Sequence, residues 1–300
     1  MRKRKEVRRK RGGKLDESTL PVFILTHGRA DTMKTAATLK RCGWTGPVYF
    51  IVDNEDSTVD RYRELYGAEN VAVFDKKAVA ERIDVCDNFE GRKVIIYARC
   101  ASYDVARDLG YRYFIQLDDD YSMFWETMNE EGQFERYYCL ILDEVLYAFL
   151  EYFKSLPMNV VTLAMAQGGD FIGGENSPMA HDLMLRRKAM NSFICDVERP
   201  IPFAGRMNED VNAYICGQSM GKVCLTSPLA HLTQTQTQSM DGGMSEIYRS
   251  GGTYVKSFYS VIMSPSCISI GEMGDTRKRL HHKVKWNNAV PKILSEEHKK

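Results

Sequence analysis

The sequence predicts an α/β fold in which a mostly parallel sheet carries helices on both faces. Continuous apolar runs of strand length alternate with segments of helical periodicity through the first 120 residues. Three of these runs also end in polar or acidic loops, as expected where ligands bind beyond the carboxyl ends of parallel strands. The second half of the chain is less regular, which predicts an irregular C-terminal region.

The first expected unit is a strand, a loop and a helix. The strand is Val22–Thr26, a continuous apolar run (VFILT), and the loop begins at His27. Asp31 or Thr32 can then cap a helix that runs to about Arg41.

A second strand, Val48–Val52, leads into an acidic segment that begins at Asp53. Residues 57–60 (STVD) match a capping box for a helix that ends near Tyr66. A short third strand is expected at Val71–Phe74. The helix after it is expected over Lys93–Leu109, because apolar residues recur there at helical spacing and a glycine follows.

That helix leads into residues 111–120 (YRYFIQLDDD), where strand-forming residues run into three consecutive carboxylates. A hydrophobic core does not accept unpaired acids, so these acids are expected at a strand end. Alternate side chains of an extended chain share a face, so Asp118 and Asp120 can converge on one cation while Asp119 points elsewhere. The alternative is a solvated acidic turn, which is common after a strand.

The second half contains an expected amphipathic helix near Leu142–Phe153 and strands at Val160–Ala166 and Leu183–Arg187. Asn208 is expected to cap a helix that begins at Glu209. Glycine-rich stretches near residues 168–174 and 241–243 lack the P-loop and dinucleotide patterns, so a kinase or a dinucleotide enzyme is not indicated. They are more typical of a mobile lid.

Charge is distributed unevenly, although the net charge is only +1. Residues 1–14 carry nine Lys or Arg and one Glu, and residues 277–300 carry eight basic and two acidic residues. Residues 15–276 contain 24 basic and 37 acidic residues, a balance of −13. Basic ends suit polyanions such as DNA, and a solubilising tail or a localisation signal is the open alternative.

Cysteine usage and hydropathy indicate a cytoplasmic protein. The eight cysteines are scattered without a C-x-x-C pair, which predicts neither a zinc knuckle nor a disulfide framework. No window approaches the roughly 20 apolar residues of a membrane span, and no apolar signal segment follows the basic arm.

Taken in order, these segments resemble a known family. The D-x-D triad after a strand, the upstream helix bearing Arg99 and the Asn-Glu-Asp helix start at Asn208 are similar to GT-A glycosyltransferases. The opening VFILTHGR, the LDDDY signature, the DGG loop at Asp241 and the closing HHKVKWNNAVPKIL resemble the TET-associated glycosyltransferases of phages and eukaryotes. The resemblance covers about Pro21 to Leu294. Phage members are thought to place sugars on hydroxymethylated pyrimidines in DNA.

The resemblance implies a GT-A, Rossmann-like domain over residues 21–294, with a nucleotide-sugar half (21–125) and an irregular acceptor and lid half (126–294). A basic, disordered arm (1–20) would precede it and a short tail (295–300) would follow. The implied donor is a UDP-sugar and the implied cofactor is Mn²⁺ or Mg²⁺. Asp118 and Asp120 would hold the ion, which would neutralise the diphosphate of the leaving group.

The same resemblance assigns further residues to the donor. Asp119 would touch the sugar or the ribose, and Arg99 would approach the diphosphate, although Cys100 replaces the Asn that commonly follows it. The nucleotide pocket would be lined by Thr26, His27, Gly28 and Arg29, with Asp53 and Glu55 reaching the uracil or the ribose.

Glu209 and Asp210 stand where such enzymes keep the general base that deprotonates the acceptor hydroxyl, a role that only an inverting enzyme requires. The alternative is a helix start whose acids favour the helix dipole. His231 stands where a third metal ligand is often found, and the alternative is a structural histidine.

The expected function is metal-dependent transfer of a hexose or N-acetylhexosamine from a UDP-sugar to 5-hydroxymethylcytosine or 5-hydroxymethyluracil in double-stranded DNA. The expected compartment is the cytoplasm of a bacterium or a phage-infected host cell, without membrane attachment. A protein O-glycosyltransferase, a sugar-phosphate nucleotidyltransferase and a DNA-binding module with a decayed transferase fold are the alternatives.

Overall fold

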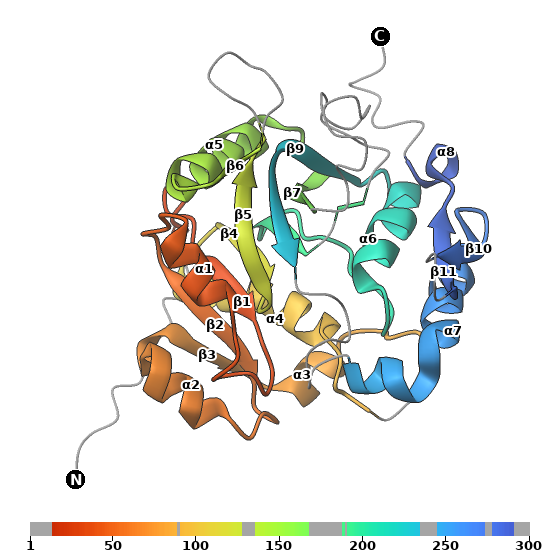
Figure 1. Cartoon of the computed structure of the whole chain (residues 1–300), viewed down its shortest axis with the longest axis horizontal. Coiled ribbons are helices and arrows are strands. Elements are labelled where there is room, and N and C mark those ends of the chain that lie inside the picture. The colour runs from red at the N-terminus through yellow and green to blue at the C-terminus, as the bar shows by residue number, and fades with distance from the viewer. Residues whose placement is uncertain are drawn as a thin grey trace.

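The computed structural model describes residues 14–88, 91–127, 136–167, 188–189, 191–234, 245–273 and 278–290. Its main feature is a nine-stranded sheet of order β3-β2-β1-β4-β8-β7-β9-β5-β6, and β10 and β11 form a separate two-stranded sheet (Figure 1). The strands are β1 (Val22–Leu25), β2 (Val48–Asp53), β3 (Val71–Phe74), β4 (Tyr113–Asp118), β5 (Tyr121–Glu126), β6 (Tyr137–Tyr138), β7 (Val160–Gln167), β8 (Ser192–Asp196), β9 (Val223–Gln234), β10 (Ile268–Met273) and β11 (Arg279–Val284). The α-helices are α1 (Thr35–Arg41), α2 (Val59–Tyr66), α3 (Lys76–Ala80), α4 (Ile96–Leu109), α5 (Leu142–Ser155), α6 (Glu209–Gly217), α7 (Ser245–Met263) and α8 (Trp286–Ala289).

The first half of the sheet is parallel. β1 pairs in parallel with both β2 and β4, and β2 pairs in parallel with β3. Leu25 at the end of β1 lies opposite both Ile51 and Asp118, so the carboxyl ends of the three strands meet at one edge. The loops that begin at His27, Asp53 and Asp118 therefore share this edge, as the predicted α/β class requires.

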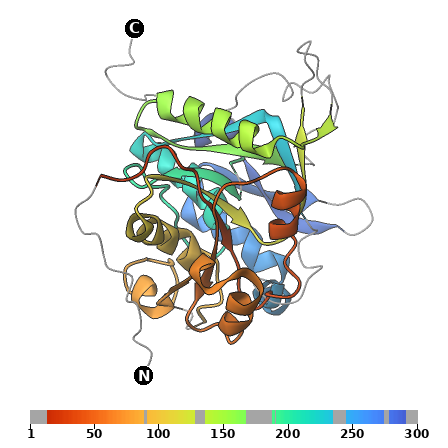
Figure 2. The same ribbon diagram turned by 90° about the vertical axis from the view of Figure 1, so that its left-hand side faces the viewer.

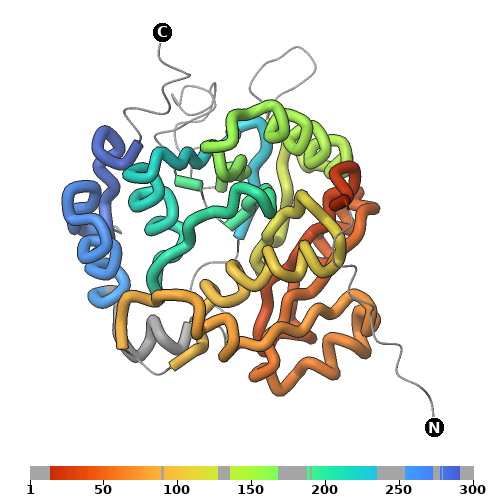
Figure 3. Tube along the Cα trace, turned by 180° about the vertical axis from the view of Figure 1, so that it is seen from behind, coloured from red at the N-terminus to blue at the C-terminus, as the bar shows by residue number. Residues whose placement is uncertain are grey.

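Helices cover both faces of the sheet because successive strand residues point to opposite sides. Ile24 belongs to a core shared with α1, α2 and α5, and Figure 2 shows α5 lying along the sheet. Phe23 belongs to the other core, which includes residues of α4 and α6 (Figure 3), and its ring stacks on Phe114 at 4.9 Å. Burial on both faces explains why these strands are continuous apolar runs.

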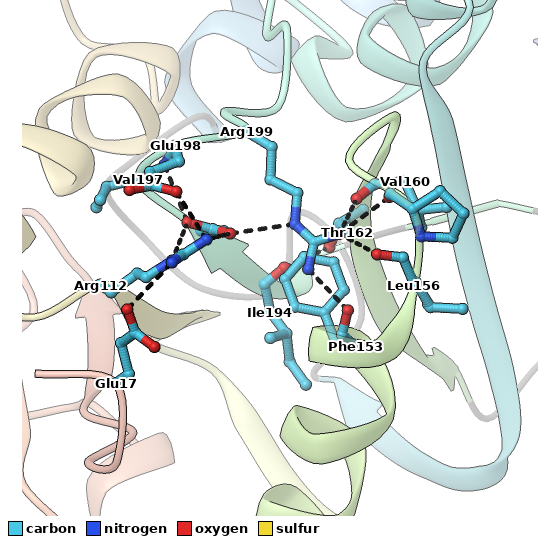
Figure 4. A network of polar contacts seen from close by, with 12 residues as sticks. Glu17, Arg112, Phe153, Leu156, Val160, Thr162, Ile194, Val197, Glu198 and Arg199 are labelled. Atoms are coloured by element: carbon cyan, nitrogen blue, oxygen red, sulfur yellow. Dashed lines mark hydrogen bonds and ion pairs between the residues drawn. The ribbon is translucent and has the colours of Figure 1, made fainter. Parts of the chain in front are cut away.

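A buried ion-pair network anchors the end of α5 to the sheet (Figure 4). Arg199 donates from Nε to Asp196 Oδ2 at 3.2 Å, and its guanidinium lies 3.8 Å from the centre of the Phe153 ring. Its Nη1 and Nη2 atoms also donate to four backbone carbonyls, those of Phe153, Leu156, Pro157 and Val160. Arg112 contacts the other side of the Asp196 carboxylate, which is fully buried.

The second half of the sheet is mixed, with antiparallel β4–β8, β7–β8, β5–β9 and β5–β6 pairs and a parallel β7–β9 pair. β5, β6, β8 and β9 are not among the strands predicted from the sequence. β5 begins directly after the three acids. In the sequence its first residues therefore look like a continuation of the acidic turn. β8 is short, and all five of its residues are buried.

Several predicted helix starts are wrong, and at two of them another residue bonds to the backbone at the helix start. The first helix begins at Thr35 rather than at Asp31 or Thr32, since the Thr35 N–H donates to the Asp119 carbonyl at 3.3 Å. The capping box is not formed, because Thr58 is the N-cap and Asp56 accepts from its N–H and hydroxyl.

Two other starts also differ. α4 begins at Ile96 instead of Lys93. Asn208 occupies the N-cap of α6, but its φ of 53° is left-handed and its side chain makes no cap. Its Nδ2 donates instead to the Lys256 carbonyl and to Ser260 Oγ of α7, at 2.7 and 3.1 Å. The residue therefore joins α6 to α7.

The C-terminal region is more regular than predicted, since α7, β10, β11 and α8 were all expected to be irregular. Figure 1 shows α6 between the sheet and the unit formed by α7, β10 and β11. The body also begins before the expected boundary, because Asp16 bridges to Tyr111 and Leu20 is fully buried. The Leu183–Arg187 strand, both glycine-rich stretches and the basic arm up to residue 13 lie outside the described residues. Within the described residues, no helix is long and apolar enough to cross a lipid bilayer.

Candidate active site

The three acids lie in the tight connection between β4 and β5. Asp118 is the last residue of β4, Asp119 and Asp120 form the turn, and β5 begins at Tyr121. Thr35 at the start of α1 fixes this turn, because its hydroxyl donates to the Asp118 carbonyl at 2.6 Å and accepts from the Tyr121 N–H at 3.0 Å. The carboxylates therefore have a rigid frame built from a strand end and a helix start.

Arg99 of α4 lies behind Asp118 and is fully buried. Its Nη2 donates to Asp118 Oδ1 at 2.7 Å and to Asn191 Oδ1 at 3.1 Å. Its Nε donates to Glu209 Oε1 at 3.4 Å. Burial raises the pKa of Asp118 to about 6 against the opposing charge of Arg99. Nη1 of Arg99 has no hydrogen-bond partner among the residues that the structure describes.

The structure brings both candidate bases to this arginine. Glu209 and Asp210 open α6, and both are buried. Burial and the neighbouring charge of Asp210 together raise the pKa of Glu209 to about 7, although Arg99 acts in the opposite direction. A carboxyl group with a pKa near neutrality suits general base chemistry.

Asp120 is the most strongly perturbed acid of the turn. Burial raises its pKa to about 7, and the charges of Asp118 and Asp119 add to that effect. Gln234, the last residue of β9, lowers the pKa of Asp120 and places its Nε2 atom 3.5 Å from Asp118 Oδ2. No sequence pattern selected Gln234, which is one of several glutamines in a short repetitive run.

Asp119 faces the loop after β1. Its Oδ1 accepts from Arg29 Nη1 at 2.7 Å, and its Oδ2 accepts from the Thr26 hydroxyl at 2.8 Å. Tyr62 of α2 completes this unit, since its hydroxyl lies 2.8 Å from the Thr26 hydroxyl and accepts from the Arg29 N–H at 2.9 Å. Because the Thr26 hydroxyl gives its proton to Asp119, Tyr62 is the donor to Thr26. Sequence patterns offered no signal for Tyr62.

The end of β2 carries a second polar cluster. Asp53 Oδ2 lies 2.7 Å from His27 Nδ1 and 3.2 Å from the Nζ atom of buried Lys76. Burial raises the pKa of Asp53, but His27 and Lys76 outweigh burial and hold it below its ordinary value. The Gly28 N–H donates to Asp56 Oδ2 at 2.7 Å, and the φ of +68° at Gly28 favours glycine there. Lys76 and Asp56 were not selected from the sequence.

Two further predicted positions lie beside these clusters. Glu55 accepts from Arg92 Nε and Nη2 at 2.9 and 2.6 Å, in a partly exposed ion pair. Cys100 follows Arg99 on α4, and burial raises the pKa of its thiol to about 12. A thiol of that pKa stays protonated at neutral pH and is not a nucleophile.

His231 is not brought together with the acids. It lies inside β9 opposite Trp125 of β5, and the two rings stack at 5.8 Å. Burial, together with the charge of Arg136, lowers the pKa of His231 to about 4. Within the described part of the chain, no three His, Cys, Asp or Glu side chains gather in a group that could hold a metal ion. β9 extends to Gln234, so Gln234 is the β9 residue that reaches Asp118.

Comparison with known proteins identifies the family. A search of curated proteins finds no match. One solved structure with a related arrangement is that of GalNAc-T7 with UDP, GalNAc and Mn²⁺, at 13% identity and a TM-score of 0.41. The match covers 72% of this chain but only 43% of that one, and at this similarity it carries no argument about the site. A family model described as TET-Associated Glycosyltransferase matches residues 20–243, well over half of the chain. The protein therefore belongs to the TET-associated glycosyltransferase family.

Proposed function

We propose that this glycosyltransferase uses a divalent cation to move a sugar from a UDP-sugar to the hydroxyl of a 5-hydroxymethylpyrimidine in double-stranded DNA. The observation that carries the proposal is the set of three carboxylates in the β4–β5 turn, at the sheet edge where the loops after β1 and β2 also begin. Parallel strands present ligand sites at this edge.

The residues present fit a hard cation such as Mn²⁺ or Mg²⁺. Asp118 and Asp120 supply carboxylate oxygens, and the raised pKa values of about 6 and 7 reflect buried negative charge that a cation would relieve. Mg²⁺ is often held by one or two carboxylates together with substrate phosphates and waters, so a third protein ligand is not required. When bound, the ion would stabilise the negative charge that develops on the UDP leaving group.

The donor pocket is assigned to the β1 and β2 loops. Thr26, Arg29 and Asp119 form one hydrogen-bonded unit, which would present the Gly28 loop to the nucleotide. Asp53 is already held by His27 and Lys76, so we assign base or ribose recognition to the pair formed by His27 and Asp53. Glu55 would extend this surface at its rim.

Arg99 would act on the diphosphate from behind the carboxylates. Its Nη2 and Nε atoms are occupied by Asp118, Asn191 and Glu209, whereas Nη1 has no partner among the described residues. A buried guanidinium nitrogen needs an acceptor, and a phosphate oxygen is a suitable one. Glu209 or Asp210 would accept the proton of the attacking hydroxyl if the reaction inverts the anomeric centre.

Two features support DNA as the acceptor. The family that the chain matches is described as TET-associated. In addition, basic residues concentrate in residues 1–14 and 277–300, on either side of an acidic chain. Basic segments bind polyanions with salt-sensitive affinity.

The proposal is tested by incubating the protein with Mn²⁺ or Mg²⁺, a panel of UDP-sugars and DNA carrying 5-hydroxymethylcytosine or 5-hydroxymethyluracil. Digestion to nucleosides and mass spectrometry should reveal a hexose or N-acetylhexosamine addition that EDTA abolishes. Unmodified DNA is the control substrate, and the Asp120→Ala variant is the control enzyme. Sugar transfer to a Ser- or Thr-containing peptide, with none to either modified DNA, would reject the DNA acceptor. Full activity in the presence of EDTA would reject the proposed requirement for a divalent cation.

A further inference from the structure

The β10–β11 ribbon carries a basic outer face that none of the donor-site residues explains. It consists of Ile268–Met273 and Arg279–Val284, paired antiparallel. It lies beyond residue 243, where the match to the family model ends. Within the two strands the sole acid is Glu272, which forms an ion pair with Lys278 at 3.1 Å.

The pleat of the ribbon separates its two faces. His282 points inward and is buried, whereas Lys283 and the following Lys285 are exposed. His281, at an alternate position to Lys283, is half-buried. A Cβ atom added to Gly271 would lie 2.3 Å from Lys283 Cε, so the Lys283 stem runs over the glycine on the neighbouring strand. The outer face therefore presents the exposed positive charge of Lys283 and Lys285.

Further positive charge gathers where the ribbon meets the body. Lys188 is exposed and Lys256 is half-buried. Both are close enough to add to the effect of burial on His282, whose pKa falls to about 4. Because His282 points inward, these two lysines add positive charge on the inner side of the ribbon, on α7 and on the segment before β8.

Hydrogen bonds connect this unit to the start of α6, which carries the candidate bases. Asn208 immediately precedes Glu209 and donates to the Lys256 carbonyl and Ser260 Oγ of α7. Ser257, on the same helix, donates to the Leu280 carbonyl of β11 at 2.8 Å. A polymer held on the ribbon would be held at a fixed position relative to the start of α6.

We infer that the outer face of the β10–β11 ribbon, with Lys283 and Lys285, binds the phosphate backbone of the duplex DNA that carries the acceptor base. The 5-substituent of a pyrimidine lies in the major groove, and that groove admits a two-stranded ribbon. Lysines on a strand that flanks an acidic body place the positive charge where the polyanion must approach. The inference rests on the proposed DNA acceptor and adds the surface that binds it.

The test compares Lys283→Gln/Lys285→Gln with a matched control, Lys40→Gln/Lys77→Gln. Both pairs are exposed and remove the same charge, but Lys40 and Lys77 lie on α1 and α3. Fluorescence anisotropy with a labelled hydroxymethylated duplex is measured between 50 and 300 mM KCl. The ribbon variant should bind roughly tenfold or more weakly at about 0.1 M salt, and the slope of log K against log salt should become shallower by about 2. The control variant should keep the wild-type slope.

Kinetics separate this inference from the proposed function. In the ribbon variant the KM for DNA should rise while the KM for the UDP-sugar and the melting temperature stay at the wild-type values. A wild-type salt slope in the ribbon variant would overturn the inference even if the wild-type enzyme modifies DNA. An equal loss in the control variant, or tighter binding to duplex RNA of the same sequence, would overturn it as well. Weaker DNA binding by the ribbon variant would support it even if no sugar transfer to DNA were detected.

Discussion

Arg99 and Asp118 form a buried ion pair, with Arg99 Nη2 donating to Asp118 Oδ1 at 2.7 Å. The arginine comes from α4 and the acid from the end of β4, so the pair ties a helix to the strand that carries the candidate metal site. Glu209 joins the same arginine from α6. Asp118 therefore supports the fold as well as the chemistry, whereas burial and the charges of the neighbouring acids disfavour the ionised form of Asp120.

This difference predicts separate outcomes for the two acids. Asp118→Ala should abolish sugar transfer and lower the free energy of unfolding by about 3 kcal/mol, because it leaves a buried guanidinium without its nearest carboxylate. Asp120→Ala should also abolish transfer but should leave stability at pH 8 unchanged or higher, since it removes a buried carboxylate that is costly to ionise. Urea unfolding and a transfer assay check both variants. Equal destabilisation by the two substitutions would contradict this assignment of roles.

Tyr62→Phe should raise the KM for the UDP-sugar about fivefold. The tyrosine hydroxyl links Thr26 and the Arg29 N–H, and one such hydrogen bond contributes about 1 kcal/mol. The kcat of the variant should change little, because the Tyr62 hydroxyl holds the donor loop and is not one of the two candidate general bases, Glu209 and Asp210. Tyr147→Phe is the matched control, since Tyr147 accepts from the Leu20 N–H instead. A similar rise in the KM of the control variant would show that the rise does not come from the contacts of Tyr62 with the donor loop.

Arg199→Met should lower the free energy of unfolding by about 3 kcal/mol or more without altering the KM for the UDP-sugar. The variant removes the donors to four carbonyls around the end of α5 and one partner of buried Asp196 (Figure 4). Arg63→Met, which removes an exposed ion pair with Asp60, should change stability by less than about 1 kcal/mol. Chemical denaturation measures the free energy of unfolding of both variants. A similar loss of stability in the two would refute the structural role of Arg199.

His282 predicts acid sensitivity of the C-terminal unit. Its folded pKa of about 4 lies below its ordinary value of 6.5. Between these values the unfolded chain binds a proton that the folded protein excludes, so stability is present above about pH 6.5 and is lost as the pH falls toward 4. His282→Leu should therefore lose less melting temperature than the wild type between pH 7 and pH 5. If the melting temperatures of the two proteins fell equally over this pH range, protonation of His282 would not be the cause of the acid sensitivity.

The parallel part of the fold and the position of the acids could be predicted from sequence. The sheet is covered on both faces, so the strands β1, β2, β3 and β4 are apolar runs. Such runs can be recognised in the sequence without tertiary information. The acids at Asp118–Asp120 could also be recognised in the sequence, because they follow directly on the apolar run of a buried strand. The family was identified from the order of these segments and was confirmed by the family model.

Tertiary structure decided what those residues contact. The sequence alone fixes the local period of a strand or helix, so it identified Asp118 but not Gln234, which reaches it from 116 residues further along the chain. It likewise identified Thr26 but not Tyr62, and it offered His231 as a metal ligand although that residue lies inside β9 opposite Trp125. Contacts between distant segments depend on how helices and strands pack, and that packing also buried Arg99 behind the acids and raised the pKa values of Asp118 and Asp120.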